Sequence, residues 1–144
     1  MNTNVMFTDM VGYSKLTGDD QNLALELLKE HDKIIEPLIA KYKGTIVKRI
    51  GDAIVAIFDD ASNIIQSAVE IQQSLKNRNN RNTKSRHIIL RIGLHHGEII
   101  LKNNEVHGLG YELASSIEPI CEYGGIAVSQ NLYDHTNENN ELIL

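Results

Sequence analysis

Apolar residues recur at helical spacing between Asp19 and Tyr42, and Gly44 follows as a stop signal. This pattern predicts one long amphipathic helix with apolar positions at Leu23, Leu25, Leu27, Leu28, Ile34, Ile35, Leu38 and Ile39. Pro37 lies inside the helix and lacks a backbone N–H, so we expect either a local kink or a break into two helices.

The next segments alternate between strand and helix. GTIVKRI and AIVAIF are rich in β-branched residues and flank Gly51-Asp52, a dipeptide typical of two-residue turns, so they predict a β-hairpin with Asp52 at its tip. A second amphipathic helix is expected from about Ala61 to Lys76. For NRNNRNTKSR, which follows, a polar loop and local disorder are equally compatible with the composition.

The last third of the chain completes an α+β pattern. HIILRIGLHHGEIIL predicts a long central strand that ends in a turn at KNNE. We expect a third helix from about Leu109 to Glu122, a stop at Gly124-Gly125, a short strand at IAVS and a last helical turn in SQNLYDHT. This order predicts an antiparallel or mixed sheet with helices packed on one face, a sandwich of ferredoxin-like type. No repeat or linker divides residues 1–144, so we expect a single domain.

Composition narrows the classes of function. The 144 residues include 14 Lys+Arg against 19 Asp+Glu, a net charge of −5 that does not favour nucleic-acid binding. The single cysteine, Cys121, and the absence of a signal peptide predict a reduced, cytoplasmic protein. No apolar run reaches the roughly 18 residues of a membrane span, so we expect no membrane contact from this chain.

Two acidic residues follow predicted strands and could meet at one edge of the sheet. Asp9, in FTDMVGYS, ends the first strand, and Asp52 lies at the hairpin tip. Neighbouring carboxylates repel each other and favour a divalent cation such as Mg²⁺ or Mn²⁺. Gly12 would let a phosphate approach the backbone where the next helix begins. Each motif alone is more typical of a helix cap or a turn than of a metal site, and only their joint occurrence favours the metal site.

Four segments, in this order, resemble the catalytic domain of class III nucleotidyl cyclases, the adenylate and guanylate cyclases. They are FTDMVGYSKLT, GTIVKRIGDAIVAIF, LRIGLHHGEII and ELASSIEPICEYGGIAVS. The resemblance implies a palm-like fold and a head-to-tail homodimer or heterodimer with catalytic sites between the subunits. It also implies a reaction in which the 3′-hydroxyl of a nucleoside triphosphate attacks its own α-phosphate, giving a cyclic nucleotide and pyrophosphate.

The resemblance also implies roles for individual residues. Asp9 and Asp52 would be the catalytic ligands of two metal ions, Mg²⁺ or Mn²⁺, with the backbone carbonyl of Met10 as a further ligand. The phosphate-contacting turn of the family matches Gly12, Tyr13 and Ser14.

Two further positions concern the nucleotide base. Lys48 matches a position at which adenylate-forming members carry lysine and guanylate-forming members carry glutamate. An ammonium group can donate to adenine N1, whereas guanine N1 is itself a donor, so Lys48 favours ATP. The alternative is a strand lysine on a solvent face. Glu105 lies near the family's second base-reading position.

The pattern departs from active family members at two transition-state positions. An asparagine that orients the ribose and an arginine that stabilises charge at the α-phosphate are replaced by Glu112 and Ser116. The chain also ends before a further phosphate-binding lysine and the closing strands, so the domain is short or is a fragment. Three interpretations follow: a weak or unusual cyclase in which Arg49 or Arg91 substitutes, the metal-bearing half of a heterodimer, or a nucleotide-binding pseudoenzyme.

Other features carry weaker signals. His95 and His96 are adjacent strand residues that point to opposite faces, so they cannot easily share one metal ion. Cys121 lies on an apolar helix face and is expected in the core. Polymerases and diguanylate cyclases share palm-like architecture, but the net charge disfavours a nucleic-acid channel, and the GGDEF signature is absent.

Overall fold

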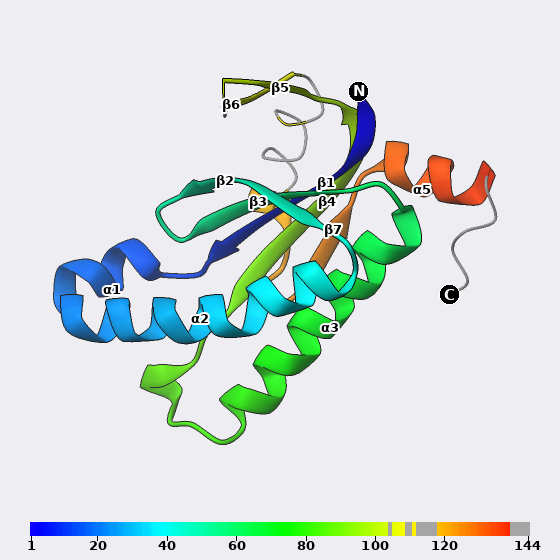
Figure 1. The fold of residues 1–144 in the computed structure, drawn as a ribbon. Helices are drawn as coiled ribbons and strands as arrows, with labels where there is room; N and C mark the ends of the chain where they lie inside the picture. The colour runs from blue at the N-terminus through cyan, green and yellow to red at the C-terminus, as the bar shows by residue number, and fades with distance from the viewer. Residues whose placement is uncertain (104, 109–110, 112–117, 139–144) are drawn as a thin grey trace.

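A mixed, mostly antiparallel sheet forms the centre of the domain (Figure 1). The computed structural model of the chain describes residues 1–103, 105–108, 111 and 118–138. Within these residues the order of the large sheet is β2-β3-β1-β4-β7, and only β7 runs parallel to its neighbour. The strands are β1 (Asn2–Met10), β2 (Thr45–Ile50), β3 (Ala53–Phe58), β4 (Leu90–Glu98) and β7 (Ile126–Val128). The predicted α+β class and the hairpin at Asp52 are confirmed.

The long helix predicted between Asp19 and Tyr42 is confirmed as one continuous helix, and a separate short helix precedes it. A short α1 (Tyr13–Asp19) precedes α2 (Gln21–Lys41), and the side chain of Asp20 caps α2 by accepting a hydrogen bond of 3.0 Å from the backbone N–H of Leu23. A break at Pro37 was the wrong alternative, because α2 continues through this residue. Pro37 itself is exposed, whereas Ile35 and Ile39 on either side are buried and keep the helix against the sheet.

The second helix, α3 (Ala61–Asn79), begins where the pattern predicts and extends beyond Lys76. The polar segment after it is held by its own side chains. Asn79 exchanges two hydrogen bonds with the backbone of Ile88, of 2.8 and 2.9 Å, and Arg78 forms an ion pair with Glu30 of α2. A short 3₁₀ helix, η1 (Lys84–Arg86), completes the connection to β4.

The predicted long strand from His87 to Leu101 is interrupted. β4 ends at Glu98, and a separate hairpin of β5 (Ile100–Lys102) and β6 (Glu105–His107) follows. At the junction, Ile99 is fully buried and its N–H donates to the carbonyl of Met1. The predicted turn at KNNE lies at the tip of this hairpin, where Asn103 has a φ of 53°, a conformation that asparagine tolerates.

The predicted third helix, Leu109 to Glu122, lies mostly outside the described residues. Its described end differs from the prediction, because Glu118–Ile120 form a 3₁₀ helix (η2) and neither Cys121 nor Glu122 is helical. Cys121 is nevertheless buried, as expected. The last helical turn proves to be a longer helix, α5 (Gln130–Glu138). No helix in the described part of the chain has the length and apolar character needed to cross a membrane.

Strand alternation gives the sheet two unequal faces. Helices α2 and α3 lie on one face (Figure 1) and enclose the main core. Its largest fully buried side chains include Met6, Leu27, Ile35, Ile39, Ile54, Phe58, Ile64, Ile71, Leu90 and Ile92. The opposite face has a smaller apolar cluster around Val5, Val55 and Ile99. We call this second surface the open face.

Gly44 packs so closely against Phe58 at the end of β3 that a methyl group at residue 44 is expected to destabilise the fold. A Cβ atom at Gly44 would lie 2.5 Å from ring atoms of Phe58 and 2.8 Å from Ile39 Cγ2. We expect Gly44→Ala to lower the free energy of unfolding by about 1–3 kcal/mol, measured by urea denaturation. The control is Gly18→Ala in α1, where nothing lies within 4 Å and stability should not fall. Equal stabilities of the two variants would contradict this packing.

Candidate active site

Asp9 and Asp52 meet where the first strand and the hairpin tip lie side by side. β1 and β3 are antiparallel neighbours with Thr8 opposite Ile54, so Asp9, near the end of β1, lies beside the turn before β3. The backbone N–H of Met10 donates to Asp52 Oδ2 at 2.7 Å. Helix α1 is capped by Gly12 without a side-chain bond, so Asp9 is not its cap.

The two carboxyl groups interact electrostatically. Burial raises the pKa of Asp52 from 3.8 to about 6, and a hydrogen bond and charge repulsion from Asp9 act in the same direction, against the stabilising Met10 N–H. Within the described residues no cluster of three His, Cys, Asp or Glu side chains could hold a metal. The oxygen donors of Asp9, Asp52 and the Met10 carbonyl nevertheless fit Mg²⁺ or Mn²⁺, which take further ligands from water and phosphates.

Arg91 supplies a cation at the same place. It lies directly across from Asp9 in the β1–β4 pairing, and its Nη2 is 3.1 Å from Asp9 Oδ2. Its Nη1 donates to the carbonyl of Pro119 at 3.3 Å, and its guanidinium carbon is 5.8 Å from the ring centroid of Tyr123. Arg91 is therefore held by three different segments beside the carboxylate pair.

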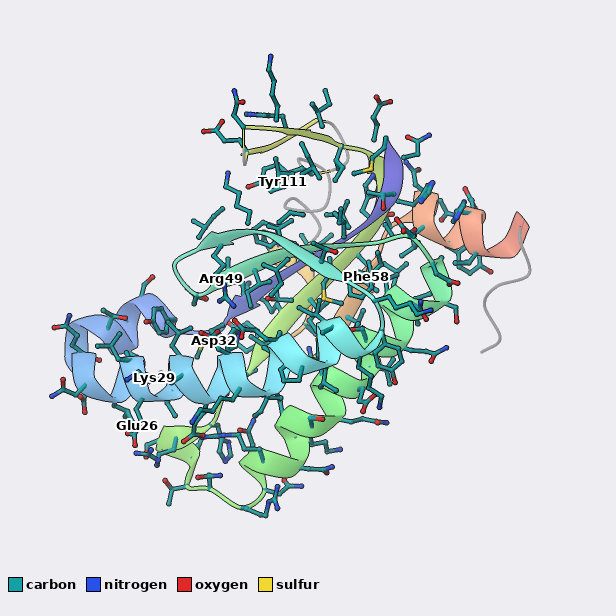
Figure 2. All side chains as sticks on the ribbon, viewed as in Figure 1. Glu26, Lys29, Asp32, Arg49, Phe58 and Tyr111 are labelled. Atoms are coloured by element: carbon teal, nitrogen blue, oxygen red, sulfur yellow. The ribbon has the colours of Figure 1, made fainter. Side chains whose placement is uncertain are left out.

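Arg49, the other arginine considered from sequence, lies on the wrong face to join them. It pairs across the hairpin with Ile54, whose side chain is in the main core. Its guanidinium reaches Asp32, 3.3 Å away, and Glu36, both on α2 (Figure 2). The structure therefore does not bring Arg49 to the carboxylate pair.

A β-bulge in β2 directs Lys48 to the open face. Ile46 pairs with Ala56 on the core side, and regular alternation would place Lys48 there too. The register shift between them instead pairs Lys48 with Val55, on the same face as Asp9. Lys48 Nζ lies 5.3 Å from the ring centroid of Tyr111, and this centroid is 6.3 Å from the ring centroid of Phe7.

The remaining predicted positions differ in accessibility. Gly12 has a φ of 75° and, like Ser14, is exposed, whereas Tyr13 packs partly against the main core. Phosphate contacts from this turn would therefore come from the backbone and the Ser14 hydroxyl. Glu105 is exposed on β6, and its Oε2 lies 3.1 Å from His107 Nε2. Glu112 and Ser116 lie outside the described residues.

The fold and this site define a class of protein, a nucleotide-cyclase palm domain, and comparisons with known proteins agree. The sequence model of the adenylate and guanylate cyclase catalytic domain matches residues 1–142. The chain belongs to this family. A cyclase structure from Silicibacter pomeroyi, titled adenylate/guanylate cyclase/hydrolase, is similar with a TM-score of 0.87 and 32% identity, covering 96% of this chain and 81% of the other. The guanylyl cyclase domain of the RhoGC fusion protein from Blastocladiella emersonii shares the fold, with a TM-score of 0.82 and 19% identity over 95% of this chain and 85% of that one.

Curated relatives are much longer than this chain. Putative adenylate cyclase 3 of Rhizobium meliloti is 30% identical over 139 residues, which are 96% of this chain but 24% of the relative. The adenylate cyclase of Streptomyces griseus is 25% identical over 86% of this chain and 30% of its own length. The match in these proteins therefore concerns one domain of each.

The carboxylate pair predicts a pH-dependent stability in chelator. Because folding raises the pKa of Asp52, the protonated carboxyl makes its full contribution to stability below pH 3.8. This contribution is lost as the pH rises to about 6. The Asn side chain of Asp52→Asn does not ionise, so this variant does not lose stability over the same pH range. Above pH 6 and without metal, its free energy of unfolding should exceed that of the wild type by about 1 kcal/mol, a value reduced because the Asp52 carboxyl is partly exposed. Urea denaturation of both proteins between pH 4 and pH 7 tests this. A stability difference that does not change with pH would contradict it.

Proposed function

We propose that this domain converts ATP into cyclic AMP and pyrophosphate, in intracellular signalling by cyclic nucleotides. The 3′-hydroxyl oxygen bonds to the α-phosphorus, the bond from that phosphorus to the bridging oxygen breaks, and pyrophosphate leaves while the hydroxyl proton is released. The observation that carries the proposal is the pairing of Asp9 with Asp52 at the edge of the open face. Both residues belong to a chain that matches the cyclase family over almost its whole length.

The roles of the side chains follow from their charges. Asp9, Asp52 and the Met10 carbonyl would hold two ions of Mg²⁺ or Mn²⁺. When bound, such ions neutralise phosphate charge and lower the pKa of the attacking hydroxyl. Arg91, 3.1 Å from Asp9, is placed to contact a phosphate oxygen once a metal competes for that carboxylate. The exposed turn at Gly12 and Ser14 would bind phosphate beside it.

Lys48 would select the base, and its replacement tests the choice of ATP. Lys48→Glu removes the donor to adenine N1 and adds an acceptor for guanine N1. We expect the ratio of kcat/KM for ATP to that for GTP to fall by about tenfold or more, because unmatched hydrogen-bonding groups reject a substrate strongly. The control is Lys33→Glu, the same charge reversal on the exposed side of α2. An unchanged ratio would contradict a base-reading role.

A second function is favoured by the sequence at the transition-state positions. Glu112 and Ser116 replace an asparagine and an arginine that the family resemblance leads one to expect. A dimer of this chain would then lack both groups, whereas a partner cyclase domain could supply them across the interface. The alternative function is therefore a nucleotide-binding, metal-bearing subunit that is weak or inactive without such a partner.

The deciding experiment measures bound nucleotide and product together. The purified chain is incubated with Mn²⁺ or Mg²⁺ and with ATP or GTP, and cyclic nucleotide is quantified beside nucleotide affinity. Metal-dependent cyclic AMP supports the cyclase. Binding without product supports the metal-bearing subunit, and neither binding nor product would overturn both functions.

A further inference from the structure

A cleft outside the candidate active site lies beside the C-terminal half of α3. Its volume is about 490 Å³, within the range of small-molecule sites. The walls come from α3, the segment before β4 and the segment before β7 (Figure 1). The apolar lining includes Leu75 and Ile88, which are 2% and 1% exposed, and the polar lining includes Gln73, Lys76 and His87. Among the described residues, no carboxylate lines this cleft.

The chain segment that supplies most of the cleft lining is basic in sequence. Between Glu70 and Glu98 the sequence contains six Lys and Arg residues and no acidic residue; the cations are Lys76, Arg78, Arg81, Lys84, Arg86 and Arg91. Three of these cations have ion-pair partners: Arg78 with Glu30, Arg86 with Glu26 and Arg91 with Asp9. No described acidic side chain forms an ion pair with Lys76, so its ammonium group is available to an anion in the cleft.

Tyr123 connects this cleft to the candidate active site. Tyr123 is 68% exposed and lines the cleft, and the guanidinium carbon of Arg91 lies 5.8 Å from its ring centroid. Arg91 in turn contacts Asp9 at 3.1 Å. The N–H of Gly124 donates to the carbonyl of Leu90 at 2.8 Å, so the backbone beside Tyr123 is fixed to β4. The Tyr123 side chain therefore lies between the cleft and Arg91 on a backbone that is bonded to β4.

We propose that the cleft is an effector site for a small aromatic anion. The ring of the ligand would stack on Tyr123, and its anionic group would face Lys76. Stacking would change the position of the Tyr123 ring and so the orientation of Arg91 toward Asp9. The binding step stands on the cleft alone. The regulatory consequence rests on the proposed cyclase function.

Binding is tested by titrating 2-naphthoate into the ¹⁵N-labelled full chain and following the NMR spectrum. We expect saturable shifts at residues 76, 87, 123 and 124 and at Arg91 Nε, with a Kd of about 1 mM, as for other ligands of this size. Lys76→Glu should weaken binding by about tenfold, since it replaces attraction by repulsion. The matched control is Lys84→Glu, the same reversal outside the cleft. No saturable shift, or equal weakening by both variants, would overturn the site.

Substitutions of Tyr123 test whether ligand binding in the cleft reaches Arg91. Tyr123→Ala should leave Arg91 Nε unmoved by 2-naphthoate, whereas Tyr123→Phe, which keeps the ring, should behave as wild type. Binding that never moves the Arg91 signal would overturn the connection. In an active chain, 2-naphthoate should change kcat/KM for ATP in the wild type, and the same change in Lys76→Glu should need about tenfold more ligand. No change in the wild type would overturn the regulatory role. A chain without cyclase activity would count against the proposed function. The NMR titrations would still test whether the cleft binds the ligand.

Discussion

Asp9→Ala is expected to lower metal-dependent cyclic AMP formation by about 10³-fold or more, because loss of a metal ligand removes several kcal/mol of charge stabilisation in the transition state. Asp9 and Asp52 lie together at the edge of the open face, and the Met10 N–H already binds Asp52. One carboxylate cannot replace the other in this arrangement. The measurement is kcat/KM for ATP with Mn²⁺, beside a titration of metal affinity.

The controls for this variant separate chemistry from folding. Asp59→Ala removes an exposed acid at the other end of β3 and should leave activity near wild type. Asp9→Ala also breaks the contact with Arg91, so thermal unfolding in chelator checks that the domain stays folded. A folded Asp9→Ala protein with wild-type activity would show that this carboxylate holds no catalytic metal.

Local sequence patterns predicted most of the fold, because turn residues and the spacing of apolar residues determine where turns, helices and strands form. The Gly51-Asp52 turn, the period of α3 and the strand at IAVS all have the expected positions. The sequence indicated only that Asp9 and Asp52 could meet at one edge, which requires β1 to lie beside the hairpin, and the strand order β2-β3-β1 meets this condition. Helical spacing also located α2, predicted between Asp19 and Tyr42 and observed at Gln21–Lys41. Sequence patterns did not give the bounds of α1 (Tyr13–Asp19), a short helix that buries no side chain fully and therefore has no apolar period.

Longer-range features left no signal in the sequence. The bulge in β2 decides that Lys48 faces the site and Arg49 faces α2, and neither residue type reveals which. Arg91 and Asp9 are 82 residues apart in the chain and meet only through strand register. Tyr123 gave no motif, yet it lies between Arg91 and the cleft. These positions depend on pairing and packing across the sheet rather than on local preference.

The double substitution Glu112→Asn with Ser116→Arg tests the cause of any weak activity. It restores the ribose-orienting amide and the guanidinium that the family resemblance implies, and it removes a carboxylate that would repel a triphosphate. An arginine in this role contributes about 10³ to 10⁵ in rate in related phosphoryl-transfer chemistry, so we expect kcat to rise by about 10³-fold or more. The rate is measured at saturating ATP with Mn²⁺ present.

The single variants show which group is responsible for that gain. Ser116→Arg alone should recover part of it, because Glu112 would still oppose the phosphates, and Ser115→Arg is the matched control that moves the same charge by one residue. If Arg91 already stabilised the transition state, the double variant would gain little and Arg91→Ala would remove the remaining activity. A gain that survives Arg91→Ala would assign the missing function to position 116. A folded, dimeric double variant without any gain would mean that residues 112 and 116 do not occupy the transition-state positions.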